Sequence, residues 1–447
     1  MALIKPFCGF LYNREKIDDL ATVVAPPYDV ITPSQQDGYY RRHPYNVIRL
    51  ILGKEEPTDK DTSNKYTRAA AYFSTWKEKE VLTRSRRPSI YLYLQDYTIP
   101  DGRSLQRKGF ICLVRLEEFG AGVIRPHERT LSKPKVDRLN LMRACSANFS
   151  SIFSIYADPD RTVEQVALTG RGSFPFDITD ENGVRHRFWS VDDEETIETI
   201  QAVMMEKSLL IADGHHRYET ALNYRDLMRS RFPGLSDEAP FNYTMMYCTN
   251  MHDAGLVILP THRLVRHIAF DLDIFAAKAQ QYFDMETFPT TPKEDLTLRK
   301  KIMATMENEG QDRYIFCMFC KKRNGYFLFR LKDYALLDGS MEAGMSTALR
   351  RLDTNILERL IFNQLMGISC NDPQYEECFK FVHSDEEAVQ LVQEGDCEVA
   401  FLGNPTRIEQ VNDIVAQGEK MPQKSTYFYP KLLSGLVINQ INPEEKI

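Results

Sequence analysis

The chain of 447 residues lacks a long hydrophobic run. No stretch approaches the roughly 20 apolar residues that a membrane span needs, so we expect no membrane partner. Near the start, Lys5 and Pro6 interrupt any hydrophobic region that a secretory signal would require. The nine cysteines are an odd number and lie scattered in apolar surroundings, as is typical of reduced core thiols. Together these features predict a cytoplasmic protein.

The chain also lacks an excess of positive charge. Its net charge is −7 and its pI is about 5.8, whereas broad affinity for nucleic acid needs a concentrated basic surface. We therefore expect no nucleic-acid partner, although a local basic groove stays possible. Zinc ligands are scarce as well. Cys317 and Cys320 are the one close cysteine pair, and their apolar run predicts a buried strand rather than a zinc site.

Several familiar catalytic motifs are missing. There is no GxSxG elbow for a nucleophilic serine and no GxGxxG loop for a dinucleotide. Lys424-Ser-Thr426 lacks the glycine-rich segment that precedes the lysine of a phosphate-binding P-loop, and no two histidines have the HExxH spacing. These absences argue against four common types of active site.

The bulk composition is that of an ordinary globular protein, with 43% hydrophobic and 27% charged residues. A chain of this length exceeds the size at which a single hydrophobic core continues to enlarge, so two or three domains are expected. Helical and strand patterns alternate irregularly with hairpin signals, which predicts a mixed α+β fold rather than a doubly wound parallel sheet. We expect an N-terminal catalytic region at 1–268 and a C-terminal mixed α/β region at 269–447.

Local patterns predict individual elements. A helix is expected over 64–81, a hairpin from strands 90–97 and 108–115, and a strand over 47–51 that contains Arg49. A long loop is expected through 124–138, followed by a helix at 139–145. The two prolines of Val23-Val-Ala-Pro-Pro-Tyr-Asp-Val-Ile31 predict an extended turn that presents Tyr28 and Asp29.

The most informative stretch is Ala212-Asp-Gly-His-His-Arg-Tyr-Glu-Thr220, which we call the DGHHR turn after residues 213–217. An apolar run at 208–212 predicts a buried strand before it, and apolar residues at helical spacing predict a helix after it. The first N–H groups of a helix have no intrahelical hydrogen-bond acceptor and carry partial positive charge. The start of a helix therefore attracts anions. Arg217 and the two imidazoles strengthen that attraction, while Asp213 is suited to hold a metal ion or orient a histidine. The turn predicts a phosphate-handling or metal-assisted active site.

Other polar clusters lie beside turn prolines and glycines. They are Tyr28 with Asp29; Arg125, His127, Glu128 and Arg129; Lys133, Lys135 and Arg138; Lys424 to Thr426; and, more weakly, His262 with Arg263. An inventory rich in Arg, Lys and His with few carboxylates suits phosphoryl transfer, where catalysis is mostly positioning and charge neutralisation. A carboxylate would accept the proton of an attacking hydroxyl, and Mg²⁺ would bridge phosphate oxygens and a carboxylate.

Six blocks, in order along nearly the whole chain, resemble one family. They are Ala25-Pro-Pro-Tyr-Asp-Val-Ile31, Asn46-Val-Ile-Arg-Leu50, Arg125-Pro-His-Glu128, Ala212 to Leu222, Pro260-Thr-His-Arg263 and Met421 to Lys431. The family was long catalogued only as conserved proteins of unknown function. Some members are pyrophosphate-dependent free serine kinases, which make O-phosphoserine for cysteine biosynthesis. The DGHHR turn also looks like the motif of the ADP-dependent free serine kinases, which have a ParB/sulfiredoxin type of fold.

The resemblance implies a ParB/sulfiredoxin-like core that carries the turn, and phosphoryl transfer to free L-serine. Pyrophosphate is the expected donor, with a nucleotide as the alternative, and Mg²⁺ the expected cofactor. Asp29 matches by position the carboxylate base of the ADP-dependent enzymes, and Glu128 is its rival. The remaining residues to which the resemblance points are His216 in catalysis; Asp213, Gly214, His215, Arg217, Arg49, Arg263 and Lys424 in phosphate binding; and Tyr28 and His127 in substrate binding.

Two other functions stay open at this stage. The turn is also compatible with a nucleotide-binding ParB-like switch protein that transfers nothing to a small molecule. A metal-dependent hydrolase would use Asp213, His215 and His216, joined by His127. The sequence does not discriminate pyrophosphate, ADP and ATP, because each presents a similar diphosphate to the turn. It does not give the oligomeric state either.

Overall fold

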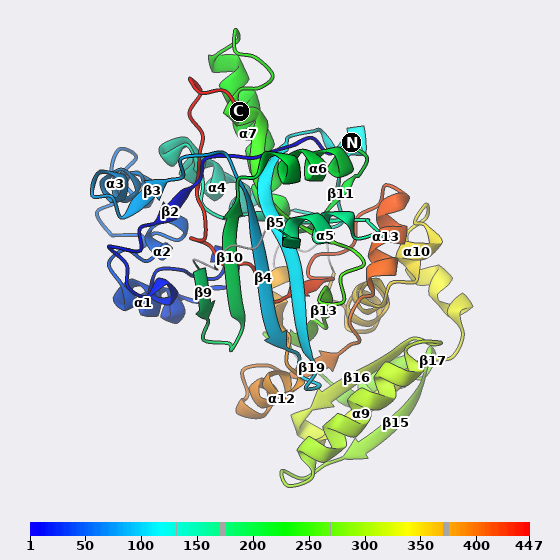
Figure 1. Ribbon diagram of the computed structural model, residues 1–447. Coiled ribbons are helices and arrows are strands. Elements are labelled where there is room, and N and C mark those ends of the chain that lie inside the picture. The colour runs from blue at the N-terminus through cyan, green and yellow to red at the C-terminus, as the bar shows by residue number, and fades with distance from the viewer. Residues whose placement is uncertain (131, 170–175, 269, 370–374) are drawn as a thin grey trace. The chain divides into compact units, whose positions relative to one another are not determined.

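The computed structural model describes residues 1–130, 132–169, 176–268, 270–369 and 375–447 (Figure 1). Helices and sheets are mixed, as predicted for an α+β fold. The chain forms two compact units. The first comprises Met1–Pro126, Thr130–Val257 and Pro430–Ile447, and the second comprises His127–Arg129 and Ile258–Tyr429.

This division differs in three places from the one expected after residue 268, and the first is that His127–Arg129 belongs to the second unit. The second unit already begins at Ile258, because strand β14 (His262–Val265) pairs with strands β18 (Phe379–Val382) and β19 (Val399–Leu402) of its sheet. The C-terminal segment from Pro430 belongs to the first unit, where its backbone is hydrogen-bonded by buried side chains.

The first unit is built on a mixed sheet. Its strands are, in spatial order, β6 (Ile124–Pro126), β11 (Leu209–Asp213), β8 (Ile152–Tyr156), β12 (Tyr243–Asn250), β5 (Ser104–Arg115), β4 (Ile90–Thr98), β10 (Arg185–Val191) and β9 (Phe176–Thr179), with β1 (Ile4–Lys5) beside β5. The pairs β11–β6 and β12–β8 are parallel, whereas the other pairs are antiparallel. The predicted hairpin is the long β4–β5 pair, which runs beside β10 (Figure 1).

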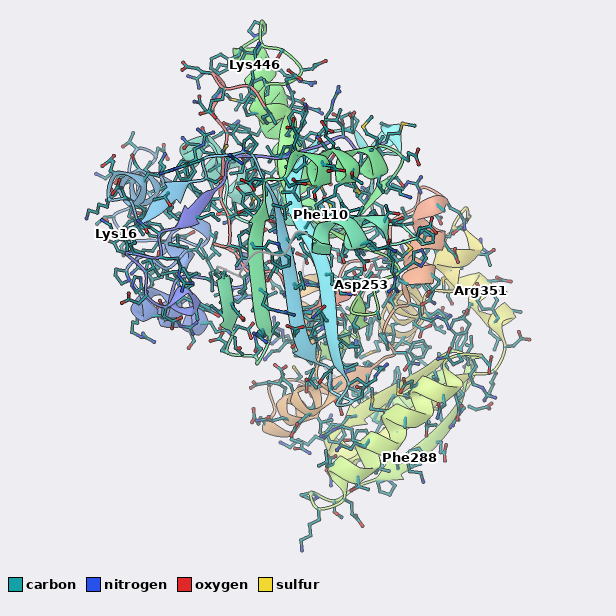
Figure 2. All side chains as sticks on the ribbon, in the orientation of Figure 1. Lys16, Phe110, Asp253, Phe288, Arg351 and Lys446 are labelled. Atoms are coloured by element: carbon teal, nitrogen blue, oxygen red, sulfur yellow. The ribbon has the colours of Figure 1, made fainter. Side chains whose placement is uncertain are left out.

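Alternation along the strands separates the two faces of this sheet. On β4, Ile90, Leu92 and Leu94 enter a large apolar core, while the residues between them lie on the other face. Phe110 of β5, labelled in Figure 2, is 1% exposed in the same core. Helices α5 (Thr162–Thr169), α6 (Glu194–Met204) and α7 (His215–Arg231) contribute apolar side chains to it, and Met142 of the helix at 132–145 contributes another.

The remaining regular elements of the first unit are short strands and four helices. They are β2 (Phe10–Tyr12) paired with β3 (Leu82–Arg84), β7 (Ala147–Asn148) paired with β21 (Asn439–Gln440), and the helices α1 (Pro33–Arg42), α2 (Ile48–Ile51), α3 (Lys65–Glu78) and α4 (Ser132–Cys145). Within the described residues, no helix has both the length and the apolar character that a membrane crossing requires.

The second unit has an antiparallel sheet with an apolar core on each face. Its strand order is β15 (Phe283–Pro289), β17 (Gly325–Leu331), β16 (Ile315–Cys320), β19, β14 and β18. One core includes α9 (Asp295–Glu309) and α12 (Asp385–Glu394). The other includes α8 (Leu272–Ala279), α11 (Asp353–Ile356) and the π-helical η7 (Leu357–Leu365), and α10 (Thr347–Arg350) and α13 (Ile408–Ala416) complete the unit. Cys317 and Cys320 are buried on β16, as predicted.

The strand expected over 47–51 is wrong, because this segment forms the helix α2. Asn46 is completely buried, and its side-chain oxygen accepts the N–H of Ile48 at 2.9 Å. Its amide group donates to two backbone carbonyls more than 20 residues away in sequence. This cap bends the chain into a helical turn. A short, fully buried apolar run does not distinguish helix from strand by periodicity.

The expected loop through 124–138 is also partly wrong. Helix α4 already begins at Ser132, so Lys135 and Arg138 lie on a helix. Pro134 is compatible with this start, because proline is tolerated in the first helical turn, where its missing N–H is not needed.

Candidate functional site

The DGHHR turn joins β11 to α7, as the sequence predicts. The pairing of β11 with β8 is irregular between Ile211 and Asp213, which re-aims the end of the strand. Gly214 then has φ +92°, a conformation that side chains disfavour. A Cβ at this position would lie 2.8 Å from Nε of Arg217. Glycine therefore permits both the turn and the close approach of the guanidinium.

Asp213 is bound by two cations. Its Oδ2 accepts a hydrogen bond from Nη2 of Arg217 at 2.6 Å, and its Oδ1 accepts one from Nζ of Lys431 at 2.8 Å. Burial alone would raise the pKa of this carboxyl, but Lys431 and Arg217 outweigh it and hold the pKa well below its usual range. Two cations thus face one permanent anion at the start of a helix, and the local charge is positive.

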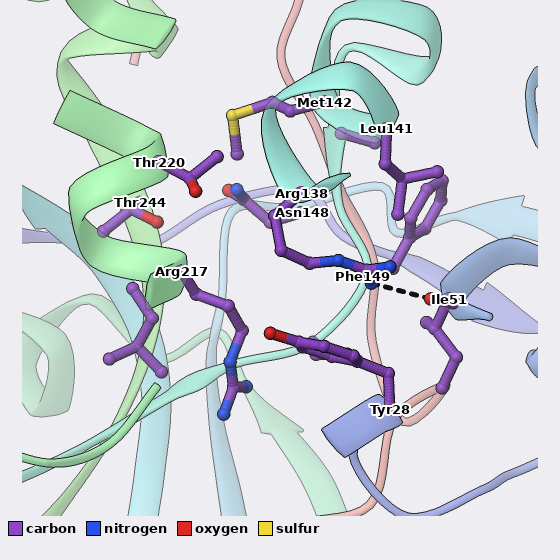
Figure 3. Close-up of a pocket in the computed structure, with 13 residues that line it drawn as sticks. Tyr28, Ile51, Arg138, Leu141, Met142, Asn148, Phe149, Arg217, Thr220 and Thr244 are labelled. Atoms are coloured by element: carbon purple, nitrogen blue, oxygen red, sulfur yellow. Dashed lines mark hydrogen bonds between the residues drawn. The ribbon is translucent and has the colours of Figure 1, made fainter. Parts of the chain in front are cut away.

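A cavity of about 50 Å³ lies next to the turn, within the first unit. Figure 3 shows the Tyr28 ring beneath the Arg138 guanidinium, with the Tyr28 hydroxyl directed into the space near Arg217. The guanidinium carbon of Arg138 lies 3.9 Å from the ring centroid, and its Nη1 donates to the carbonyl of Ile51 at 2.6 Å. Two guanidinium groups and a phenol therefore line the same small space.

Tyr28 and Asp29 lie in a single 3₁₀ turn, Tyr28–Val30, directly after the two prolines. Burial raises the pKa of Tyr28 to about 12. Asp29 acts in the same direction, while Arg138 and Arg217 oppose it. Tyr28 is therefore a neutral hydrogen-bonding group at physiological pH. The Asp29 side chain, in contrast, is exposed to solvent.

The two histidines differ in burial. His215 is 5% exposed and acts electrostatically on Asp213, whereas His216 is half-buried. Both belong to the first turn of α7, a helix of 17 residues. The positive end of the helix dipole adds to the charge of the neighbouring cations there.

Arg49 serves the local structure in this arrangement. Its Nη1 and Nη2 donate to the carbonyls of His43 and Tyr40, each at 2.9 Å, and the guanidinium lies over the Tyr40 ring. These contacts tie α2 to the end of α1. They use one N–H of each terminal nitrogen.

Three of the predicted residues gather in the second unit. His127 is buried, and its Nε2 lies 2.8 Å from Oγ1 of Thr426. Glu128 accepts a hydrogen bond from the backbone N–H of Lys424, whose side chain is exposed and whose φ is +56°. His127 and Glu128 thus bind the backbone and side chains of the Lys424-Ser-Thr426 segment.

Arg263 joins the same group from β14. Its Nη2 donates to the carbonyl of Lys424 at 3.2 Å and its Nη1 to the carbonyl of Thr261 at 3.1 Å. Burial lowers the pKa of this guanidinium, with Glu358 and Glu128 opposing. The predicted residues therefore form two groups. One surrounds the DGHHR turn in the first unit, and the other surrounds Lys424 in the second.

Two residues at the turn were not assigned a role from the sequence. Lys431 is the last residue of the Met421 to Lys431 block, and Arg138 belongs to a basic cluster that by itself predicts only a solvated loop. Lys431 could have been found from the sequence, because it belongs to one of the six blocks that resemble the family. Arg138 lies outside those blocks, so the sequence indicates its role less clearly. Across the described residues, no three His, Cys, Asp or Glu side chains form a group that could hold a metal ion.

Residues 4–355 match the family described as "Protein of unknown function (DUF1015)". The match covers well over half of the chain, so the protein belongs to this family. A comparison with curated proteins found no significant match.

Among solved structures, the chain is similar to a free serine kinase in complex with AMP, at 11% identity and a TM-score of 0.35, over 75% of this chain and 93% of the other. A conserved hypothetical protein from Pyrococcus furiosus is 12% identical with a TM-score of 0.32, over 71% and 90%. SbnI with a C-terminal truncation, from Staphylococcus aureus, is 10% identical with a TM-score of 0.33, over 73% and 86%.

Proposed function

We propose that this protein is a phosphotransferase that moves a phosphoryl group from pyrophosphate, or from a nucleotide, to the hydroxyl of free L-serine. The observation that carries the proposal is the charge arrangement of the DGHHR turn. There, Arg217 and Lys431 flank the single carboxylate of Asp213 at the start of α7. Such a site favours a polyanion, because helix N-termini and guanidinium groups both bind phosphate oxygens.

The six sequence blocks support the choice of reaction, since some members of the family that they resemble are pyrophosphate-dependent free serine kinases. In the proposal, His215, His216 and Arg217 bind the donor phosphates. The cavity beside the turn is lined by Tyr28, Arg138 and Arg217, which suits a small polar substrate. Tyr28 would donate a hydrogen bond there, since its raised pKa keeps the phenol protonated.

Asp29 is the better candidate for the base. Its carboxylate is exposed, it follows Tyr28 directly, and it belongs to the same unit as the turn. Glu128 already accepts the backbone N–H of Lys424. A solvent-exposed carboxylate next in sequence to Tyr28, which lines the cavity, suits the role of proton acceptor in the proposal.

The proposed step balances without an oxidant or a reductant. The serine hydroxyl oxygen attacks the terminal phosphorus of the donor, and the new O–P bond forms as the bond to the bridging oxygen breaks. The hydroxyl proton passes to Asp29, and with pyrophosphate as donor the leaving group is inorganic phosphate. Arg217 stabilises the phosphate charge during transfer, as expected of positioned cations in phosphoryl transfer.

Mg²⁺ fits the residues present. It is usually held by one or two carboxylates together with waters and substrate phosphates rather than by a full protein cage. Here the donor phosphates and waters would hold the ion, because Asp29 is assigned as the base and Asp213 is already engaged by two cations. Bound with the donor, the ion would neutralise phosphate charge. Chelation with EDTA should abolish turnover, and added Mg²⁺ should restore it.

A product assay tests the proposal. Purified protein is incubated with L-serine and Mg²⁺, with pyrophosphate, ADP or ATP in separate reactions, and O-phosphoserine is measured by mass spectrometry. Product in one reaction supports the proposal and identifies the donor. No product in any reaction, from protein with the circular dichroism of a folded chain, contradicts it. Reactions without serine provide the blank.

A further inference from the structure

The segment Pro430–Leu433 lies on buried polar side chains of the first unit's sheet. Nη2 of Arg107 donates to the carbonyl of Pro430 at 2.5 Å, and Nε2 of Gln95 donates to the carbonyl of Lys431 at 2.9 Å. Two residues further on, the N–H of Leu433 donates to the Tyr93 hydroxyl at 3.3 Å. Three side chains of β4 and β5 therefore hold the backbone on both sides of Lys431.

These three side chains share one face of the sheet. Gln95 and Arg107 are cross-strand partners of the β4–β5 hairpin, and Tyr93 precedes Gln95 by two residues. Gln95, Arg107 and Tyr93 are all completely buried. This face thus presents polar side chains that bind the segment Pro430–Leu433, whereas the opposite face of the sheet packs in the apolar core.

Burying Arg107 has a cost that its contacts must offset. A buried guanidinium is destabilising unless its donors are satisfied. Here it donates to the side-chain oxygen of Gln95 as well as to Pro430, and it lies 4.5 Å from the centroid of the Phe153 ring. An apolar pair would fill this position at less cost, but it would leave the backbone of the segment without these bonds.

These backbone contacts determine where the Lys431 ammonium lies. The Lys431 side chain is 13% exposed, and its Nζ binds Oδ1 of Asp213. Arg217 binds the other carboxylate oxygen of Asp213. An ammonium has three N–H donors, so one lysine can contact a carboxylate and a phosphate oxygen at the same time. With its backbone held by side chains of β4 and β5, Lys431 has little freedom to leave the turn.

We infer that Lys431 is a phosphate-binding residue of the DGHHR turn, and that Gln95 and Arg107 are positioning residues that act through it. The inference deepens the proposed function and rests on it for the identity of the phosphate ligand. The contacts of the segment with one sheet face, and the ion pair between Lys431 and Asp213, are the observations that carry it.

The test measures donor binding and turnover in the full chain. Binding is measured by calorimetry with the donor that supports turnover, or with pyrophosphate where none does. Lys431→Met should weaken donor affinity about 10- to 100-fold, the range for loss of a charge-assisted contact, and should raise KM more than it lowers kcat. Lys431→Arg should recover part of the affinity. Lys446→Met, an exposed lysine of the same C-terminal segment, is the matched control and should bind as the wild type does.

A double-mutant cycle separates positioning from general stability. Gln95→Leu should weaken donor affinity several-fold in the wild-type background and have no further effect when Lys431 is already Met, because residues that act through one another are not additive. Equal effects of Gln95→Leu in both backgrounds would overturn the positioning role. The tryptophan fluorescence of Trp76 and Trp189, both in the first unit, reports whether each variant is folded.

The outcomes also separate this inference from the proposed function. Wild-type donor affinity in Lys431→Met, beside a wild-type protein that makes O-phosphoserine, would overturn the inference alone. A wild-type protein that makes no product but binds pyrophosphate, with binding weakened by Lys431→Met, would support the inference and contradict the serine kinase. A wild-type chain that makes no product and binds neither pyrophosphate nor a nucleotide would overturn both.

Discussion

Replacing Asp213 with Asn removes the anion that two cations share and keeps the size of the side chain. Arg217 and Lys431 would then face each other across a neutral amide, each only 12–13% exposed. Removing one partner of such a buried ion pair typically costs about 3–5 kcal/mol. We take the lower end, about 3 kcal/mol, because Asp213 itself is 17% exposed.

Urea unfolding measures this loss. The chain's two tryptophans, Trp76 and Trp189, are both buried in the first unit, so their fluorescence reports the unfolding of that unit. With a urea dependence of roughly 3 kcal/mol per molar, the midpoint of Asp213→Asn should fall by about 1 M. Asp160→Asn, which changes an exposed aspartate of the same unit, should shift the midpoint little.

The pH dependence gives an independent check. The folded pKa of Asp213 lies below that of the unfolded chain, about 3.9. Its contribution to stability is therefore complete above the unfolded pKa and is lost as the pH falls toward the folded pKa. The difference between wild type and Asp213→Asn should be constant from pH 5 to 8 and shrink below pH 4. Equal midpoints at pH 7, or a difference that grows in acid, would refute the ion-pair argument.

Three further predictions follow. Gly214→Ala should weaken pyrophosphate binding in calorimetry, because its Cβ would displace Arg217, whereas Gly183→Ala, with a similar positive φ but open space around it, should not. Lowering the pH from 6.5 to 4 should destabilise the second unit of the wild type by about 3 kcal/mol relative to that of His262→Asn, because burial lowers the pKa of His262 to about 4 and the unfolded chain takes up the proton first. Hydrogen exchange of β14 and β19 in the two proteins measures this difference. Asp29→Asn should reduce the rate of product formation at least 100-fold, while Glu128→Gln should retain most of it; the reverse order would assign the base to Glu128.

The part of the site that the sequence predicted is the part that local chemistry determines. The strand that ends at Asp213, the glycine with positive φ and the helix that begins at His215 follow within a few residues of one another. An apolar run, a glycine and a helical periodicity are therefore enough to place the turn.

The missed part depends on contacts between distant segments. Lys431 reaches Asp213 across 218 positions of sequence, and Arg107 reaches the carbonyl of Pro430 across 323. No local pattern in one sequence carries that information. The same reason explains the error at 47–51, where the buried Asn46 side chain caps a helical turn through bonds to Thr22 and Val24.

Arg49 has contacts that its residue type did not predict. Its two terminal nitrogens donate to carbonyls of the preceding helix and turn, and the phosphate contact expected of it stays a prediction. Arg138 has a place at the cavity that its sequence context did not predict. A cluster of basic residues suggests a solvated loop, whereas its helix aligns this guanidinium over Tyr28 at the cavity.

The central claim is that the DGHHR turn binds the donor phosphates for transfer to serine. It is tested most directly by measuring O-phosphoserine formation in wild type and Arg217→Met, with Arg143→Met, an exposed arginine of α4, as the control. The account predicts product from the wild type and the control, and at least a 100-fold loss in a folded Arg217→Met. Equal rates in all three proteins would contradict it.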